Sequence, residues 1–311
     1  MISRVATRRR TDCGGVSSLY VPTVEWHEAE SLSAATELMH RFGASARFLA
    51  GGTDVLVDLK SGRNAALHLI SLNRIPHLRG ISSDAAGMRI GALTTPNELL
   101  DSELVRKDFS PLLDAVSEMA APQVRNMATV GGNIASAIPS ADLPPILTVM
   151  NAQVVLWSPR GERVISLEEF FVGPRRSLKA ADEILTYVLV PNMRKNFGAA
   201  YARFALRSAN ACAVAGVAAG LRLSPAGLVE DVKLTLCAVA PTPKPVPAVG
   251  EVLSGRRPDD ATLQQAATAA MQASEPISDI RGSAEFRREI VAVLARRALD
   301  QAIVRAKGNA A

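Results

Sequence analysis

The chain has 311 residues, of which 48% are hydrophobic and 4% aromatic, and its net charge is +5. This length and apolar content suffice for two or three domains with cores of their own. The few aromatic side chains disfavour nucleic-acid binding, and no apolar run reaches the about 20 residues that a membrane-spanning helix needs.

Positive charge is concentrated at the two ends of the chain. The first residues include Arg4 and the arginines at 8–10, with no apolar stretch behind them that would make a secretory signal, so we expect residues 1–19 to be a disordered arm. The expected last helix carries a second group: Arg287, Arg288, Arg296 and Arg297. Arginines at several phases of a helix are typical of a solvated face or of contact with an acidic partner.

Residues 20–75 predict a small α/β unit. Apolar side chains at helical spacing predict a helix over Leu32–Phe42, which Gly43 ends. The pattern then predicts a strand, a short helix and a second strand, over 47–50, 55–60 and 67–72.

Residues 76–193 predict a second unit, in which helices and antiparallel strands are mixed. Alternating apolar residues predict strands over 88–93, 153–157 and 184–190. Helical spacing predicts helices over 96–100, 112–119 and 143–150. A hairpin turn is expected at 160–162, leading into a further short strand.

Residues 194–307 predict a third unit, a small sheet covered by helices. Strands are expected over 200–204, 211–223 and 232–239, and helices over 259–274 and 283–307. A proline-rich run at 241–247 lies between them, and we interpret it as a stiff connection. The unit contains no cluster of residues typical of a catalytic site.

The chain contains two glycine doublets in similar surroundings. One is Gly51-Gly52, within residues 50–54, and the other is Gly131-Gly132, within residues 129–133. Backbone N–H groups in such turns can converge on phosphate oxygens, and only glycine adopts the positive φ angles that aim them there. The two segments are therefore suited to face one ligand and hold a pyrophosphate.

The flanking residues add to this interpretation. Thr53, Thr129 and Asn133 supply side-chain donors, and the helix expected after residue 54 adds the partial positive charge of its N-terminus. Neither segment is a Gly-x-Gly-x-x-Gly dinucleotide motif or a Gly-x-x-x-x-Gly-Lys-Ser/Thr phosphate loop. The alternative is that each doublet is only a tight turn between packed elements.

An ordered set of segments resembles one known family. In chain order these are the two glycine segments, Ile-Pro-Ser-Ala-Asp-Leu-Pro-Pro at 138–145 and Glu-Phe-Phe-Val-Gly at 169–173. From about Tyr20 onward the chain resembles the FAD-binding medium subunit of the xanthine dehydrogenase and carbon monoxide dehydrogenase type of molybdenum hydroxylase. The resemblance implies an α+β fold, with a two-subdomain FAD-binding domain of the vanillyl-alcohol oxidase/MurB (PCMH) type over 20–193 and a C-terminal α/β domain of the CO dehydrogenase flavoprotein type over 194–307.

The resemblance also implies which residues bind FAD. The two glycine segments would hold its pyrophosphate, Asp142 would accept hydrogen bonds from polar parts of the cofactor, and the backbone of Leu185 would approach the flavin nucleotide. Arg203 stands where many relatives have a lysine near the flavin, so the chain departs from the family pattern there. The implied cofactor-binding residues are Ala50, Gly51, Gly52, Thr53, Asp54, Val55, Thr129, Val130, Gly131, Gly132, Asn133, Asp142, Leu185 and Arg203.

Two of these positions have a structural alternative. Asp142 is also typical of an N-cap for the helix expected over 143–150, and Leu185 is also typical of a buried strand. We expect FAD to be bound noncovalently, because the histidines all lie outside the glycine segments: His27, His40, His68 and His77.

The resemblance further implies that the chain works within a larger enzyme. A molybdopterin centre on a large partner subunit would oxidise the substrate, and two [2Fe-2S] clusters on a small partner subunit would pass electrons to FAD and then to an external acceptor, in a dimer of heterotrimers. The three dispersed cysteines form no Cys-x-x-Cys pair, which agrees with a reducing cytoplasm and disfavours a metal or cluster site in this chain.

Two other functions are open on the residues alone. One is a free-standing flavin oxidase of the same wider fold, which the absence of an apparent substrate-binding constellation disfavours. The other is a non-enzymatic interaction module whose glycine doublets are only turns. We expect no catalytic residue in the chain, no nucleic-acid partner and no membrane span.

Overall fold

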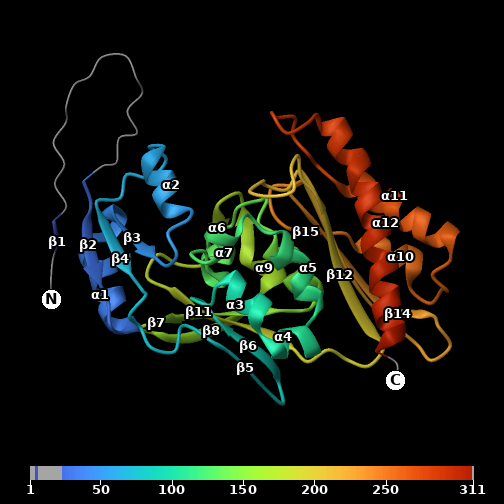
Figure 1. Cartoon of the computed structure of the whole chain (residues 1–311), viewed down its shortest axis with the longest axis horizontal. Coiled ribbons are helices and arrows are strands. Elements are labelled where there is room, and N and C mark those ends of the chain that lie inside the picture. The colour runs from blue at the N-terminus through green and yellow to red at the C-terminus, as the bar shows by residue number, and fades with distance from the viewer. Residues whose placement is uncertain (1–3, 6–22, 310–311) are drawn as a thin grey trace.

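A computed structural model of the protein describes residues 4–5 and 23–309. Figure 1 shows three units side by side, in chain order from blue to red, each built on a sheet. We expected residues 1–19 to be disordered. Apart from Arg4–Val5, these residues lie outside the part of the chain that the structure describes.

The N-terminal unit is a small sheet flanked by two helices. Its strand order is β1-β2-β4-β3, in which β4 pairs in parallel with β2 and β3, and β1 runs antiparallel to β2. The elements are β1 (Arg4–Val5), β2 (Glu25–Glu28), α1 (Leu32–Phe42), η1 (Gly43–Ser45), β3 (Ala46–Leu49), α2 (Val55–Lys60) and β4 (His68–Ser71).

The helices expected in this unit are confirmed. Ser31 caps α1 by accepting the N–H of Ala34, and Gly43, at φ 52°, ends it. The second helix has the bounds expected from the pattern, Val55–Lys60. The sequence pattern missed β2, a four-residue strand with no alternating apolar signal.

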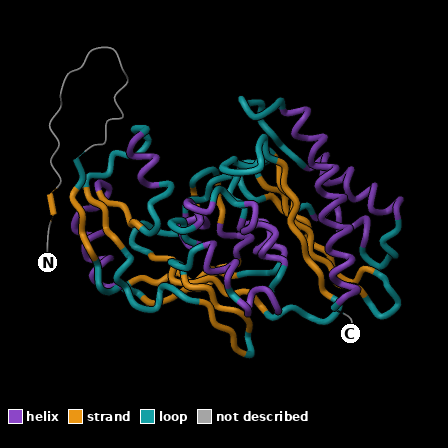
Figure 2. The backbone as a smooth tube through the Cα atoms, in the orientation of Figure 1, coloured by secondary structure: helices purple, strands orange, loops and turns teal. Residues whose placement is uncertain are grey.

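The middle unit is a five-stranded antiparallel sheet with helices over one face (Figure 2). The sheet order is β5-β6-β11-β7-β8, and side chains such as Val154 and Val188 pack against Ile134 and Ile146 from the helices. The strands are β5 (Ile81–Asp84), β6 (Gly87–Gly91), β7 (Gln153–Ser158), β8 (Gly161–Ser166) and β11 (Ile184–Pro191), with a separate ribbon of β9 (Phe171–Gly173) and β10 (Arg176–Ser177). The helices are α3 (Pro96–Asp101), α4 (Glu103–Asp108), α5 (Pro111–Glu118), α6 (Pro122–Arg125), α7 (Val130–Ala135), α8 (Leu143–Val149) and α9 (Leu167–Phe170).

The C-terminal unit is the expected sheet covered by helices. Figure 2 shows its helices on the face of the sheet that points away from the middle unit, while Tyr201 and Ala218 on the other face belong to the middle unit's core. No helix of the described residues, the 25-residue α12 included, has the length and apolar character to cross a membrane. The elements are β12 (Phe197–Phe204), β13 (Ala215–Leu223), β14 (Val229–Cys237), β15 (Lys244–Pro245), α10 (Pro247–Leu253), α11 (Asp260–Ala273) and α12 (Ala284–Gly308).

Two interpretations in this unit were wrong. The proline-rich run is not only a connection, because β15 pairs with β14 and Pro247 opens α10, where its fixed φ suits a first helical turn. Arg287 does not belong to a solvated face: it is 1% exposed and donates to three backbone carbonyls, whereas the adjacent Arg288 is exposed.

Candidate functional site

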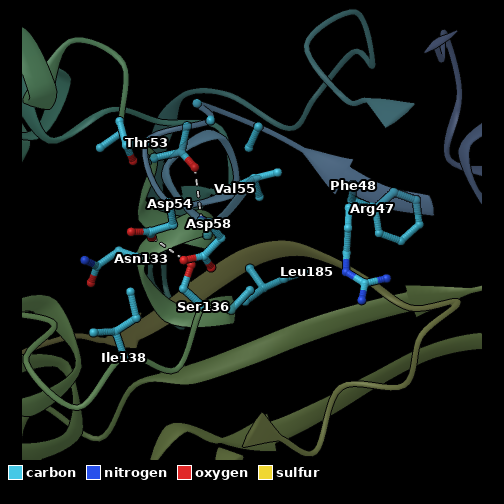
Figure 3. A pocket seen from close by; sticks show the side chains of 18 of the residues that line it. Arg47, Phe48, Thr53, Asp54, Val55, Asp58, Asn133, Ser136, Ile138 and Leu185 are labelled. Atoms are coloured by element: carbon cyan, nitrogen blue, oxygen red, sulfur yellow. Dashed lines mark hydrogen bonds between the residues drawn. The ribbon is translucent and has the colours of Figure 1, made fainter. Parts of the chain in front are cut away.

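A cavity of about 1460 Å³ lies where the N-terminal and middle units meet. Its wall comes from both glycine segments, from β11 and from residues 210–212 of the C-terminal unit, and Figure 3 shows Asp54, Asn133 and Leu185 around it. This volume exceeds the roughly 300–1000 Å³ of ordinary small-ligand pockets and suits a dinucleotide. Of the predicted cofactor-binding residues, all except Val130 and Arg203 line the cavity.

The first glycine segment connects β3 to α2. Gly52 has φ +77°, a conformation that glycine adopts without strain. A Cβ on Gly51 would lie 1.6 Å from the carbonyl oxygen of Met127, so this segment packs directly against the backbone that leads into α7. No backbone hydrogen bond among the described residues engages the N–H groups of 51–54, which leaves these donors to an acceptor ligand.

The second glycine segment differs from the turn we expected. It is the start of α7, and neither Gly131 nor Gly132 has a positive φ. The N–H groups of Val130 and Gly131 already donate to the carbonyl oxygens of Thr94 and Ala92, at 2.9 and 2.8 Å. The prediction of a second turn that presents free N–H donors was therefore wrong.

The two glycines of this helix have different surroundings, the N-cap for Gly132 and a tertiary contact for Gly131. Thr129 caps α7, its Oγ1 accepting the N–H of Gly132 at 3.0 Å. A Cβ on Gly131 would lie 2.6 Å from the Cβ of Ala92, so glycine is needed for the close approach of α7 to the end of β6. The second segment thus offers the cavity the side chains of Thr129 and Asn133 rather than its backbone donors.

Asn133 carries an unpaired polar atom. Among the described residues its Oδ1 is the buried side-chain oxygen or nitrogen that has no hydrogen-bond partner, and Asn133 lines the cavity. A buried amide oxygen without a partner costs about 1–3 kcal/mol, and native proteins pair nearly all such atoms. The cavity wall is therefore built for a polar ligand at this point.

Polar contacts join the units along the cavity. Ser136, at the end of α7, donates to Asp54 Oδ2 at 2.8 Å, as Figure 3 shows. Arg175 forms an ion pair with Asp58 of α2 at 2.7 Å. These contacts fix the first glycine segment and α2 against the middle unit.

Asp142 lines the cavity and is buried. Its carboxylate makes no cap for α8, so the N-cap alternative is excluded. Instead Oδ1 accepts the hydroxyl proton of Tyr201 at 2.9 Å, and Oδ2 accepts from Arg203 at 3.2 Å. Asp142 is thus held from the C-terminal unit, in a fixed orientation toward the cavity.

Arg203 lies behind the cavity wall. Its guanidinium bonds to Asp142 and also reaches Glu118 at 3.1 Å and the carbonyl of Ala211 at 3.4 Å. Its side chain is 2% exposed. In this arrangement Arg203 positions Asp142, because its planar guanidinium binds several acceptors at once.

Cationic side chains that the sequence did not single out also line the cavity, among them Arg47, Arg175 and Lys179. The Lys179 ammonium donates to the carbonyls of Ala180 and Glu183 at 2.9 and 3.1 Å, and burial lowers its pKa. The surrounding Arg-Arg-Ser-Leu-Lys run has the composition of an exposed loop, so the sequence did not indicate that its cationic side chains line a cavity.

Comparison with known proteins identifies the family. Residues 22–193 match the FAD binding domain in molybdopterin dehydrogenase, and residues 199–302 match the CO dehydrogenase flavoprotein C-terminal domain. The chain belongs to the flavoprotein subunits of the molybdenum hydroxylases. It is 34% identical to the carbon monoxide dehydrogenase medium chain of Hydrogenophaga pseudoflava, over 91% of this chain and 98% of that one.

Similarity to other proteins supports the same family assignment. The xanthine dehydrogenase FAD-binding subunit of Escherichia coli O157:H7 is 30% identical, over 91% of this chain and 97% of that one. The solved carbon monoxide dehydrogenase from Hydrogenophaga pseudoflava superposes with a TM-score of 0.89, covering 92% of this chain and 99% of its counterpart, at 34% identity. Quinoline 2-oxidoreductase from Pseudomonas putida 86 has a TM-score of 0.86 at 26% identity, covering 94% of this chain and 100% of that one.

The family predicted from the ordered segments is confirmed, and so is the α+β fold with its two domain types. FAD as the cofactor of this flavoprotein is confirmed by the domain match, and the chain is an oxidoreductase component, as its dehydrogenase relatives are. The individual contacts between FAD and the predicted residues stay predictions.

The buried carboxyl of this flavoprotein predicts a pH effect on stability. Burial raises the pKa of Asp142 above its usual 3.8, outweighing the opposing charge of Arg203 and the Tyr201 hydrogen bond. A carboxyl with a raised pKa contributes stability that is full below its unfolded value and is lost as the pH rises through its folded value. Asp142→Asn removes this titration. The unfolding free energy of the variant minus that of the wild type should therefore increase as the pH rises.

Urea unfolding of the FAD-free protein between about pH 4 and pH 8 measures this difference. Asp101→Asn is the control, because that carboxyl is 86% exposed and should give a small, flat difference. A difference for Asp142→Asn that falls with rising pH would mean that the Arg203 charge, rather than burial, controls this carboxyl.

Proposed function

We propose that the chain binds FAD noncovalently in the cavity between its N-terminal and middle units and is the electron-transfer flavoprotein of a heteromeric molybdenum hydroxylase. A large molybdopterin-binding subunit and a small subunit with [2Fe-2S] clusters are the partners, assembled as a dimer of heterotrimers in the cytoplasm. Electrons pass from the clusters to FAD and then to an external acceptor. The observation that carries the proposal is one cavity lined by both glycine segments of a chain in this family.

The residues present fit the cofactor. The N–H groups of 51–54 have no backbone partner among the described residues and are the donors for the pyrophosphate. Asn133 Oδ1, buried without a partner, is the acceptor for a polar hydrogen of the same ligand. The rest of the cavity wall is largely apolar, with Leu72, Leu78 and Leu185 among its residues, and suits the apolar ring system of the flavin.

When bound, FAD supplies the redox chemistry, accepting and releasing electrons. The chain's own residues bind it and set its surroundings. Asp142 is held by Tyr201 and Arg203 and fixes a polar part of the cofactor, while Lys179 and Arg47 place positive charge along the cavity. No group of the chain has to transfer a proton to substrate, because the substrate is oxidised on another subunit.

Asn133→Leu tests the cavity assignment. The leucine keeps the volume but removes the amide, so FAD affinity should fall about tenfold, the equivalent of a lost hydrogen bond to a buried group. The stability of the FAD-free protein should stay level or rise, because an unpaired polar atom is removed. Fluorescence titration of FAD into FAD-free protein measures the first quantity, and urea unfolding the second.

Asn192→Leu is the matched control, since Asn192 is exposed and donates to Asp84 and Ala85 away from the cavity. Equal FAD affinity in Asn133→Leu and wild type would remove Asn133 from the site. To test the assembly, an affinity-tagged chain co-expressed with its genomic neighbours should recover two partner subunits together with molybdenum and iron. A chain that purifies alone and whose reduced flavin turns over with oxygen would instead support the free-standing oxidase.

A further inference from the structure

Three potential metal ligands meet on the sheet of the N-terminal unit. Glu25 and His27 lie two residues apart on β2, so their side chains share one face, and the parallel register places Glu25 beside His68 on β4. None of the three lines the cavity. The cluster is therefore independent of the proposed cofactor site.

The distances within the cluster match a single coordination sphere. His27 Nε2 lies 3.1 Å from His68 Nδ1, and Glu25 Oε2 lies 3.4 Å from His68 Nδ1 and 3.8 Å from His27 Nε2. Ligand atoms about 2.0–2.2 Å from a tetrahedral Zn²⁺ are themselves about 3.3–3.6 Å apart. One ion can thus contact all three atoms with only small side-chain movements.

The surroundings hold the two imidazoles in place. The Phe42 ring stacks on His68, with centroids 3.8 Å apart and planes at 11°, and on His27 at 4.8 Å. The histidine side chains are 15% and 16% exposed, whereas Glu25 is 49% exposed and leaves a side open to water.

We propose that Glu25, His27 and His68 form a binding site for a divalent late first-row transition ion, with Zn²⁺ as the best match. Two imidazoles and one carboxylate are a ligand set that zinc accepts, and water completes the tetrahedron at the open position. The ion replaces the hydrogen bond between the two histidines, each of which then directs a lone pair at the metal. It ties β2 to β4 and stabilises the sheet on which the first glycine segment is built.

Equilibrium dialysis of untagged, chelator-treated protein against Zn²⁺, followed by metal analysis, tests the site. We expect one equivalent bound at micromolar free Zn²⁺, and a loss of affinity of about tenfold or more in His27→Gln and in His68→Gln. Co²⁺ in place of Zn²⁺ should give the visible absorption of a four-coordinate ion, read as a difference spectrum against His68→Gln. Both readouts are independent of flavin content and of activity.

His77→Asn is the matched control, because His77 is exposed, lies outside the cluster and has a positive φ that asparagine tolerates. It should bind Zn²⁺ like the wild type. Circular dichroism of each variant shows whether it is folded, and Glu25→Gln, which changes only an exposed carboxylate, gives a second test if a histidine variant unfolds. The proposal would be overturned if the wild type bound no saturable equivalent of Zn²⁺, or if His68→Gln and His77→Asn bound Zn²⁺ with equal affinity. The cluster would then be a hydrogen-bonded histidine pair.

Discussion

Flavin retention is expected to be lost when Gly51 is replaced by alanine. The added Cβ would lie 1.6 Å from the carbonyl oxygen of Met127 and 2.6 Å from its carbonyl carbon. Both atoms belong to backbone, so no side-chain rotation relieves the overlap. The first glycine segment has to move away from the chain leading into α7, and the N–H donors of 51–54 move with it. We expect the flavin content of the purified protein to fall about tenfold or more and the unfolding free energy by about 1–3 kcal/mol.

The visible flavin absorption per protein, with thermal unfolding alongside, measures this effect. Gly250→Ala is the control, because Gly250 lies in α10 with nothing within 4 Å of an added Cβ. Gly52→Ala should give a milder effect, since its Cβ would meet only the flexible side chains of Leu56 and Leu49, at 3.2 and 3.3 Å, at the cost of a strained positive φ. Full flavin content in Gly51→Ala would show that the contact between the two segments does not shape the site.

The sequence predicted helices well where local signals agree. The helix α1 has a serine cap, apolar spacing and a terminal glycine, and its bounds matched the expectation. The helix α7 was missed because a glycine doublet disfavours helix by propensity. Its conformation depends on Thr94 and Ala92, more than 30 residues away in sequence, which accept its first N–H groups.

Contacts between residues far apart in sequence also limited what could be predicted of the site. The glycine segments could be found from their composition, and Asp142 from its place in an ordered family pattern. That Tyr201 and Arg203 hold Asp142 could not be predicted, since they lie 59 and 61 residues further along the chain and meet it only when the C-terminal sheet packs on the middle unit. The pair of His27 and His68 was hidden for a similar reason, because a missed strand, β2, brings them together.

Loss of the Arg287 side chain is expected to cost about 2–6 kcal/mol of unfolding free energy, because each buried carbonyl left without a hydrogen-bond partner costs about 1–3 kcal/mol. This guanidinium is 1% exposed. It donates to the carbonyls of Val214 at 3.0 Å and Ile277 at 2.7 Å, and to that of Ala238. These carbonyls lie beside the ends of β13 and β14 and in the loop after α11, so one side chain satisfies acceptors from three segments. Arg287→Met would leave the two buried acceptors, Val214 O and Ala238 O, without this partner.

The effect should extend to the flavin site, because the carbonyl of Ala238 belongs to a residue whose own N–H donates to Pro139 at 2.8 Å, three residues before Asp142. Urea unfolding followed by both flavin fluorescence and circular dichroism should therefore show Arg287→Met releasing flavin and unfolding at lower urea than the wild type. Arg288→Met is the control: its side chain is exposed one position further along α12, and its effect should stay within about 0.5 kcal/mol. If the two variants unfold alike, the backbone contacts alone hold the strand ends, and the C-terminal unit does not need its buried arginine to support the wall behind Asp142.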